Sequence, residues 1–304
     1  MKKLLALVMM ALMVFAAACS TEQPGSDTEK EKKTKDFKIG LSISTLNNPF
    51  FVSLKEGAEK EAKAQGATLQ VADAQDDAAK QASDIEDMIQ KNVDLILINP
   101  TDSAAVGAAV QTANDADIPV ITVDRNAEAG DVIAHIASDN VAGGKQAGEY
   151  MIELVGDKAK VVELEGIPGA SATRDRGEGF HAAVDSKLDV VAKQSANFDR
   201  AKGLSVMENI LQNNKDIKAV FAHNDEMALG AVEALKAAGM EDVKVIGFDA
   251  TDDAVKAVED GKMAGTVAQK PAEIGKTGID TAIKHLKGET VEKNIPVELD
   301  LIKP

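Results

Sequence analysis

Several apolar runs of this 304-residue chain end in polar side chains that could bind the hydroxyl groups of a small ligand. The runs LILI, VITV, VFAH, VIGF and TVA lead in turn to Asn99, Asp124 with Arg125, Asn224 with Asp225, Asp249, and Gln269. Carboxylates, amides and guanidinium groups can each engage two neighbouring hydroxyls, and charge-assisted hydrogen bonds are the stronger kind. Capping of the following helix explains any single member, such as Asp225, and it also explains Thr251 before DDAVKAV. Arg and Gln, however, are poor caps. As a set, these residues indicate one binding site.

The segment STLNNPFF, residues 44–51, adds two aromatic rings to this set. Asn48 followed by Pro predicts the start of a helix, because Asn is a good N-cap and Pro suits the first helical position. Capping requires neither Phe50 nor Ser44. One interpretation is a cap with both Phe residues in the core. The other is that Asn48, Phe50 and Phe51 offer an edge and an aromatic face to a small ring, because aromatic rings cover the apolar C–H faces of a sugar.

Motifs of the common enzyme classes are missing from the sequence. It contains neither a G-x-S-x-G elbow nor a Walker loop, and GIPGAS at 166–171 lacks the spacing of a dinucleotide-binding loop. The acidic run at 73–80 lacks calcium-loop spacing, and the four His are scattered without metal-ligand spacing. We therefore expect a binding protein for a neutral sugar that is not an enzyme and uses no cofactor and no metal.

Short apolar runs alternate with amphipathic stretches from Phe37 onward. The runs are FKIGLSI, TLQVADA, DLILINP, PVITVD, VIAHIAS, KVVELEG, LDVVAKQSA, KAVFAHND, VKVIGFDA and AGTVAQ. Continuous apolar strands separated by helices predict parallel sheets covered on both faces, and the number of strands favours two doubly wound α/β lobes. In such sheets ligands bind at the carboxyl ends of the strands, which is where the polar set stands.

The first 36 residues differ from the rest. Residues 1–18 begin with two Lys, continue as an apolar stretch and end in small residues, the pattern of an export signal. The chain's single cysteine, Cys19, stands where cleavage would occur, and the segment looks like a bacterial lipoprotein signal, although Ala16 stands where Leu is usual. An ordinary cleavage site with an incidental Cys is the alternative. Residues 19–36 are too polar to form a core and would be a lipidated, flexible tether to the outer face of the cell membrane.

Composition excludes one broad class of partner. The formal net charge is −16, whereas a nucleic-acid-binding surface needs concentrated Lys and Arg. We therefore expect no nucleic-acid partner, and a sugar-responsive transcription regulator, which would need a basic DNA-binding head, is disfavoured. An exported enzyme remains the other class of alternative, and turnover of a bound sugar would reveal it.

Eight longer stretches form a recognisable pattern: STLNNPFFVSLKEGAEKEA, LINPTDSAAVG, IPVITVDR, HIASDNVAGGK, RGEGF, NFDRAKGL, NDEMALGA and VIGFD. Together they closely resemble the bacterial ribose-binding proteins of the periplasmic binding protein family, substrate-binding lipoproteins of ABC transporters. The resemblance covers essentially all of the chain from Phe37. It implies the type I fold, with two Rossmann-like lobes joined by three crossover hinge segments.

The resemblance also implies sugar contacts from both lobes. The first lobe would supply Ser44, Asn48, Phe50, Phe51, Asp124 and Arg125, the second Arg176, Phe198, Asn224 and Asp249, and Gln269 would lie by a crossover. Arg174 is a weaker candidate, because an Arg near a helix start is more often a surface residue. Residues 37–138 plus 270–298 would form the N-terminal lobe, and residues 139–269 plus 299–304 the C-terminal lobe. Crossovers are expected near Ser138–Asp139, Gln269–Lys270 and Glu298–Leu299.

The function implied by the resemblance is capture of D-ribose between hinged lobes and its delivery to an ABC permease by a monomer, with a chemoreceptor as a further partner. Allose, another pentose or a furanose-like signal molecule is the alternative ligand. The chain departs from the family pattern at His223 and Ala250, where Gln and Gly are expected beside Asn224 and Asp249. These neighbours could alter affinity while leaving the sugar contacts intact. The absence of Trp disfavours a hexose stacked on an indole ring.

Overall fold

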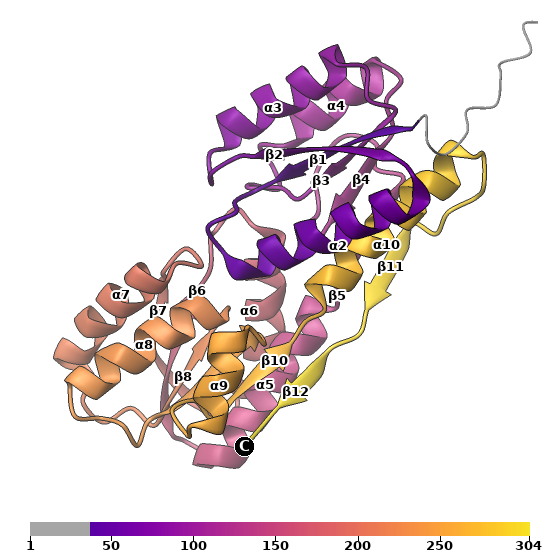
Figure 1. Ribbon diagram of the computed structural model, residues 1–304. Helices are drawn as coiled ribbons and strands as arrows, with labels where there is room; N and C mark the ends of the chain where they lie inside the picture. The colour runs from indigo at the N-terminus through magenta and orange to yellow at the C-terminus, as the bar shows by residue number, and fades with distance from the viewer. Residues whose placement is uncertain (1–36) are drawn as a thin grey trace, which may run out of the picture. The chain divides into compact units, whose positions relative to one another are not determined.

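A computed structural model describes residues 37–304, and these residues form two α/β lobes (Figure 1). The predicted signal, the tether and Cys19 lie outside the described residues. Within residues 37–304, no helix is long and apolar enough to cross a membrane.

The first lobe is built on a six-stranded sheet in which every neighbouring pair is parallel. Its strand order is β11-β5-β4-β3-β1-β2. In chain order the lobe contains β1 (Lys38–Ile43), α2 (Pro49–Gln65), β2 (Thr68–Asp73), α3 (Ala78–Gln90), β3 (Leu95–Ile98), α4 (Gly107–Asp115), β4 (Val120–Val123), β5 (Ala134–Ser138), and later α10 (Pro271–Leu286) and β11 (Asn294–Val297).

The second lobe repeats this arrangement, with strand order β12-β10-β9-β8-β6-β7. Only its edge strand β12 is antiparallel, to β10. The lobe contains α5 (Asn140–Val155), β6 (Lys160–Glu165), α6 (Ser171–Val184), β7 (Asp189–Ser195), α7 (Arg200–Asn213), β8 (Ala219–Ala222), α8 (Asp225–Ala237), β9 (Lys244–Asp249), α9 (Asp252–Glu259), β10 (Gly265–Ala268) and β12 (Asp300–Ile302).

Each predicted apolar run forms a strand, β1 to β10, because a parallel sheet covered on both faces buries both sides of its strands. The inner strands LILI and AVFA are fully buried, whereas the outer strands β2 and β7 are mostly half-exposed. The apolar runs of the sequence do not indicate β11 and β12. Both are short edge strands with few apolar residues, and Pro296 within β11 is tolerated there because an edge strand need not donate every hydrogen bond.

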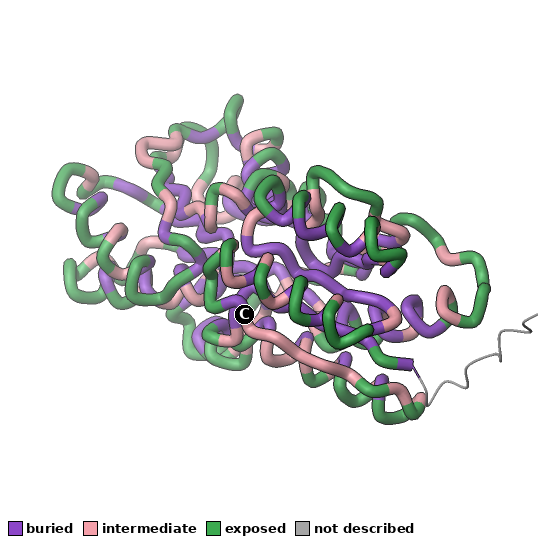
Figure 2. Tube along the Cα trace, turned by 90° about the horizontal axis from the view of Figure 1, so that it is seen from above, coloured by how far each residue is buried: buried purple, intermediate pink, exposed green. Residues whose placement is uncertain are grey.

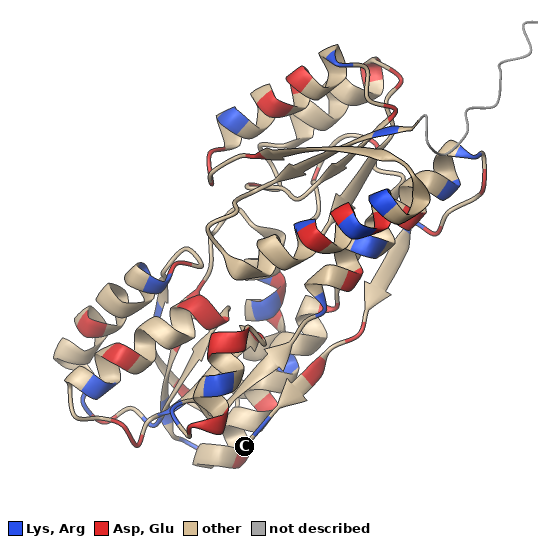
Figure 3. Ribbon diagram, viewed as in Figure 1, with Lys and Arg blue, Asp and Glu red and all other residues tan. Residues whose placement is uncertain are grey.

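Helices cover both faces of each sheet and enclose separate apolar cores. In the first lobe α2 and α10 pack on one face, and α3 and α4 pack on the other. In the second lobe α5 and α6 cover one face, and α7, α8 and α9 the other. Figure 2 shows the buried chain concentrated inside these layers and the exposed turns outside. Figure 3 shows acidic and basic residues interspersed along the outer helices of both lobes, so the negative charge of the chain is spread over both lobes.

Three connections pass between the lobes: β5 to α5, β10 to α10, and β11 to β12. Because the chain crosses three times, each lobe contains segments distant in sequence. Lobe boundaries at particular residues stay a prediction.

Glycines allow the covering helices to approach one another closely. A Cβ atom on Gly275 of α10 would lie 2.0 Å from the Leu54 carbonyl oxygen of α2, and one on Gly57 would lie 2.1 Å from the Ala272 carbonyl oxygen. In the second lobe, a Cβ on Gly144 of α5 would lie 2.1 Å from the Arg176 carbonyl oxygen of α6. These contacts leave no space for a methyl group, so the glycines determine how near the paired helices lie.

Replacing Gly275→Ala should therefore push α10 away from α2 and lower the free energy of unfolding by about 1–3 kcal/mol, the range found for overpacked cores. Urea denaturation followed by circular dichroism measures this change. Lys276→Ala, on the exposed face of the same helix, is the matched control and should change stability by less than about 0.5 kcal/mol. Equal stability of the two variants would contradict the close-packing argument.

Candidate functional site

A small cavity lies between the carboxyl ends of the strands of both sheets, the position at which doubly wound α/β sheets bind ligands. The lining consists of Asn48, Phe50, Phe51, Asp124, Arg125, Ala172, Arg176, Phe198, Asn224, Asp249 and Gln269. The structure thus brings together every predicted site residue of the described chain except Ser44, and adds Ala172.

Helix α2 positions the two aromatic rings. Asn48 is the N-cap of α2, and its side-chain oxygen accepts a hydrogen bond from the Phe50 backbone N–H at 2.9 Å. Phe50 and Phe51 then meet edge to face, with ring centroids 5.1 Å apart. The rings are buried in the lobe's core and also line the cavity, and their contact with a sugar stays a prediction.

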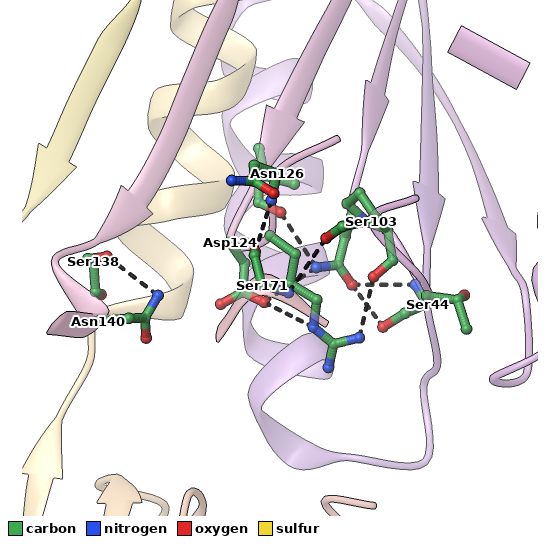
Figure 4. A network of polar contacts seen from close by, with 12 residues as sticks. Ser44, Ser103, Asp124, Asn126, Ser138, Asn140 and Ser171 are labelled. Atoms are coloured by element: carbon green, nitrogen blue, oxygen red, sulfur yellow. Dashed lines mark hydrogen bonds and ion pairs between the residues drawn. The ribbon is translucent and has the colours of Figure 1, made fainter. Parts of the chain in front are cut away.

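Ser44 lies outside the cavity lining and acts one step away from it. Its hydroxyl donates to Asn99 Oδ1 at 2.6 Å, and Asn99 Nδ2 donates to Asp124 Oδ2 at 3.1 Å (Figure 4). Ser44 is fully buried at the end of β1, so its hydroxyl reaches the neighbouring strand rather than the ligand space. Asn99 belongs to the polar strand ends that indicated a binding site, but it does not line the cavity. Its role is to connect β1 to the carboxylate that ends β4.

Arg125 and Phe198 connect the first lobe to the second. The guanidinium carbon of Arg125 lies 5.1 Å from the centre of the Phe51 ring and 5.2 Å from that of Phe198. Its Nη1 donates to the Pro100 carbonyl oxygen at 3.1 Å, and its Nε lies 3.6 Å from Asp124 Oδ2. The rings and the carbonyl hold the guanidinium flat and leave its edge available.

Arg176 is the corresponding guanidinium of the second lobe. Its Nε donates to Asn140 Oδ1 at 2.8 Å, its Nη1 donates to the His223 carbonyl oxygen, and its guanidinium carbon lies 3.8 Å from the Phe248 ring centre. Asn140 follows β5 at a crossover and is not among the residues predicted from the sequence. Polar residues directly after a strand were the available signal.

Two further strand ends complete the second wall. Asn224 caps α8 by accepting from the Met227 N–H at 3.0 Å, and its amide donates to the Phe198 carbonyl oxygen at 3.2 Å. Asp249 ends β9 and accepts from Gln269 Nε2 at 2.8 Å. Asp225 is not the cap that the sequence predicted, because Asn224 precedes it in that position. Its buried carboxylate instead accepts from the Thr251 N–H and hydroxyl and from Thr266, and the Thr251 side chain makes no cap bond.

Formal charges in the site balance, with two guanidinium groups facing two carboxylates. All four side chains are at most 6% exposed. Burial raises the pKa of Asp124, and the charges of Arg125 and Arg176 partly offset it. Burial likewise raises the pKa of Asp249 well above its usual value, against the charge of Arg176. Burial also lowers the pKa of both arginines. Such a site suits a neutral ligand, because a net charge would remain uncompensated in a desolvated space.

Two buried polar atoms of the lining have no hydrogen-bond partner in the protein. They are Arg125 Nε, a donor, and Gln269 Oε1, an acceptor. Buried polar groups without partners are rare and costly, so each calls for an explanation. A ligand that both donates and accepts hydrogen bonds, as a hydroxyl does, would satisfy both atoms.

Backbone conformation at the site is unusual for residues other than glycine. Asp124 and Asp249, at the ends of the corresponding strands β4 and β9, have φ values of 63° and 125°, and Phe198 has 59°. Ala250, where the family pattern has Gly, lies at φ 57°. Positive φ is disfavoured for side chains with a Cβ and is often retained at functional sites. The usual Gly at position 250 is therefore explained by conformation.

Contacts between the lobes lie beside the cavity. Ser171 Oγ accepts from the Asn126 N–H at 3.0 Å, and Ser103 Oγ accepts from the Ser171 N–H at 3.2 Å (Figure 4). Arg174 donates to Glu128 at 2.6 Å across the same boundary. Arg174 is a surface residue, with 45% of its side chain exposed, and does not line the cavity. The lobes are thus in a closed arrangement with direct polar contacts on this side of the cleft.

No group of three or more His, Cys, Asp or Glu side chains in residues 37–304 is arranged to hold a metal ion. The arrangement can therefore do one thing clearly: enclose a small, neutral, hydroxyl-rich molecule with planar hydrogen-bonding groups and aromatic faces drawn from both lobes.

Comparisons with known proteins agree with this geometry. The periplasmic binding protein domain matches residues 39–290. The Ribose import binding protein RbsB of Bacillus subtilis is 53% identical over 302 residues, covering 99% of each chain. A solute-binding protein of an ABC transporter from Mycobacterium smegmatis, with bound glycerol, has a TM-score of 0.85 at 36% identity, covering 88% of this chain and 94% of that one.

A second structure, a periplasmic solute-binding protein of an ABC transporter from Actinobacillus succinogenes with bound D-allose, has a TM-score of 0.82 at 34% identity. It covers 88% of this chain and 97% of its own. The domain match and the identity over nearly the whole length show that this chain belongs to the periplasmic binding protein family.

Proposed function

We propose that this chain is an extracytoplasmic binding protein that captures D-ribose between its two lobes and delivers it to an ABC-type sugar permease. The observation that carries the proposal is the cavity between the lobes, whose charge-balanced lining of hydroxyl-matching groups comes from both lobes. The 53% identity of this chain to a Ribose import binding protein supports ribose as the ligand. Another sugar, such as allose, which a related structure binds, another pentose, or a furanose-like signal molecule is the alternative.

The mechanism is a hinge equilibrium between open and closed forms. The N-terminal lobe would comprise residues 37–138 plus 270–298, and the C-terminal lobe residues 139–269 plus 299–304. Ribose favours the closed form, because only there can Arg125 of one lobe and Arg176 of the other both hold it. The permease then reads the relative position of the two lobes. A monomer suffices, since one chain supplies both walls, and a chemoreceptor that reads the closed form stays a prediction.

Selectivity follows from the geometry of the polar groups. The hydroxyls of the bound sugar would pair with buried donors and acceptors of the lining. These include the Asp124 carboxylate, which Ser44 reaches through Asn99, and the unpaired atoms Arg125 Nε and Gln269 Oε1. A sugar lacking or misplacing one hydroxyl leaves such a group unpaired in a desolvated site, which is a large penalty. Binding involves no covalent step, so we propose no enzymatic activity.

The direct test is isothermal titration calorimetry of residues 20–304, unfolded and refolded beforehand to remove retained sugar. D-Ribose should bind one-to-one and more tightly than allose, arabinose, xylose or galactose. Asn224→Ala should weaken ribose binding by about 1–3 kcal/mol, roughly 5- to 150-fold, through loss of its amide. Intrinsic fluorescence is a poor reporter in a chain without Trp.

Asn224 also caps α8, so the matched control is Asp77→Ala, which removes the N-cap of α3 outside the cavity lining. The control should lose similar stability and keep ribose affinity. Binding of a different sugar alone would keep the carrier role and refute ribose, whereas no binding of any sugar would refute both.

Closure itself is testable at the Arg174–Glu128 pair, which spans the lobes without contacting the cavity. Glu128→Gln should destabilise only the closed form and weaken ribose binding about two- to fivefold, the effect of one exposed ion pair. Asp216→Asn, which breaks an exposed Lys160 pair of similar length within the second lobe, should leave the ribose Kd unchanged. Calorimetry under identical salt separates the two, and an unchanged Kd in Glu128→Gln contradicts a closing role.

We further propose that Cys19 carries a lipid that anchors the exported protein to the outer face of the cell membrane. Cys19→Ser should move the protein from the membrane fraction to the medium or periplasm, while the purified chain keeps its ribose affinity. Fractionation with mass spectrometry of the N-terminus measures this. Recovery of an unmodified Cys19 at the N-terminus of the wild-type protein would show an ordinary cleavage site instead.

A further inference from the structure

Four titratable side chains form a continuous chain behind the ligand-binding face of the second lobe. His223 Nε2 lies 2.9 Å from Glu163 Oε1, Glu163 Oε2 lies 2.9 Å from His181 Nε2, and His181 Nδ1 lies 2.6 Å from Asp185 Oδ1. The chain runs from the buried end of β8, through the middle of β6, to the outer face of α6. None of these four residues lines the cavity.

Glu163 is the centre of this chain. It is fully buried, so its charge requires partners, and the two imidazoles supply them from two different elements. His181 belongs to α6, and His223 directly follows β8. One carboxylate of β6 therefore binds the helix that carries Arg176 and the strand end that carries Asn224.

The protonation of His181 follows from its partners. Both of its ring nitrogens face carboxylate oxygens, which only accept hydrogen bonds. A neutral imidazole has one N–H, so only the imidazolium form donates to both Glu163 and Asp185. Partial burial opposes the charge, but the hydrogen bond to Asp185 and the charge of Glu163 outweigh it and raise the pKa of His181.

Two contacts transmit the position of Glu163 to the site. Arg176 Nη1 donates to the His223 carbonyl oxygen, so the site's guanidinium rests on the residue that Glu163 holds. Gly177, the next residue of α6, packs directly over the pair: a Cβ there would lie 3.5 Å from both Glu163 Oε1 and His223 Cε1. A shift of Glu163 or His223 would therefore move Arg176.

We propose that Glu163 is a positioning residue for sugar binding, holding Arg176 and Asn224 in register through His181 and His223, and that the charge on His181 strengthens this hold. The inference rests on the proposed function. It assigns a role to His223, which stands where the family pattern has Gln, because an imidazole Nε2–H reaches the buried carboxylate from the strand end.

Other charged groups facing this chain define how it responds to pH. Lys193 of β7 lies 4.0 Å from Glu163 Oε2 and 3.1 Å from Glu165 Oε1. Burial acts to raise the pKa of Glu163, but the hydrogen bond from His223 and the charges of His181 and Lys193 lower it overall. Burial lowers the pKa of His223, and the charge of Arg176 lowers it further, whereas Glu163 acts to raise it. The lowered pKa keeps the His223 imidazole neutral.

The sign of the pH effect follows. Because the pKa of His181 is raised in the folded protein, its imidazolium bonds to Glu163 and Asp185 persist to a higher pH than an ordinary histidine allows. These charged bonds are lost as the pH rises through the pKa that His181 has in the folded protein. Glu163 then loses one partner, α6 is held less firmly to β6, and ribose affinity should fall. Asp225 and Asp249 also titrate, with the pKa of Asp225 raised by burial to about 7. All variants keep Asp225 and Asp249, so the contribution of these two carboxylates to the pH dependence cancels when variants are compared.

Glu163→Gln is the informative variant, because it keeps the shape and one acceptor while removing the charge. Its ribose Kd should be about tenfold weaker than that of the wild type at about pH 6, and up to about pH 9 it should change less with pH than the wild-type Kd, because the contribution of His181 is removed. Glu165→Gln, two residues along the same strand and paired with the same Lys193, should keep the wild-type pH profile. Calorimetry at several pH values, with thermal unfolding of each variant, provides the comparison.

Histidine NMR supplies a readout that a purely structural role would not move. The His181 imidazole should titrate at a lower pH in Glu163→Gln than in the wild type, and His181→Gln should reproduce the flattened ribose profile. Parallel pH profiles in Glu163→Gln and Glu165→Gln would overturn the inference while leaving the proposed function intact. Failure of the wild-type chain to bind ribose at any pH would overturn both.

Discussion

The structure depends on the burial of two arginine–aspartate sets at the facing ends of two sheets. Removing four charges from water is expensive, and the molecule offsets this with partners from every neighbouring element: the Pro100 carbonyl for Arg125, Asn140 and the His223 carbonyl for Arg176, Asn99 for Asp124, and Gln269 for Asp249. Two atoms of the cavity lining, Arg125 Nε and Gln269 Oε1, remain unpaired, and each matches a hydroxyl of a sugar. A site of this kind is complete only when a polar, neutral molecule is enclosed in it.

The duplicated sheet order explains why such a site is available. Both lobes wind from the centre outward, so polar residues that follow the strands of each lobe gather at one edge, and facing edges create a double wall. The correspondence extends to backbone detail: Asp124 and Asp249 end equivalent strands, and both have positive φ. The strain at these residues aims each carboxylate into the cavity rather than along its strand.

In the proposed mechanism, closing of the lobes both captures the sugar and determines the specificity. Glycines bring α5 within contact of the Arg176 backbone, and Glu163 links α6 to the strand end at His223, so the second wall behaves as a rigid unit. The first wall is rigid for another reason, the Asn48 cap and the packed rings of Phe50 and Phe51. In the proposed mechanism, closure of such walls around a sugar would leave the partner of a misplaced hydroxyl unpaired and buried.

The sequence by itself determined what depends on neighbours along the chain. Helix α2 begins after Asn48, as its capping residue predicts. The apolar runs form β1 to β10 because the residues that bury them are consecutive in the sequence. The polar strand ends identified the site, since parallel strands bring their carboxyl ends to one edge. Resemblance to a known family supplied Arg176 and Phe198, which no strand-end pattern marks.

Tertiary structure alone decided the interactions between distant segments. Ser44 binds Asn99 rather than facing the cavity, Glu163 joins His181 to His223, and Ser103 meets Ser171 across the lobes. The edge strands β11 and β12 likewise form only because β5 and β10 offer unpaired edges. Each of these pairings joins residues far apart in sequence, so its energy depends on a geometry that no local pattern of residue types contains.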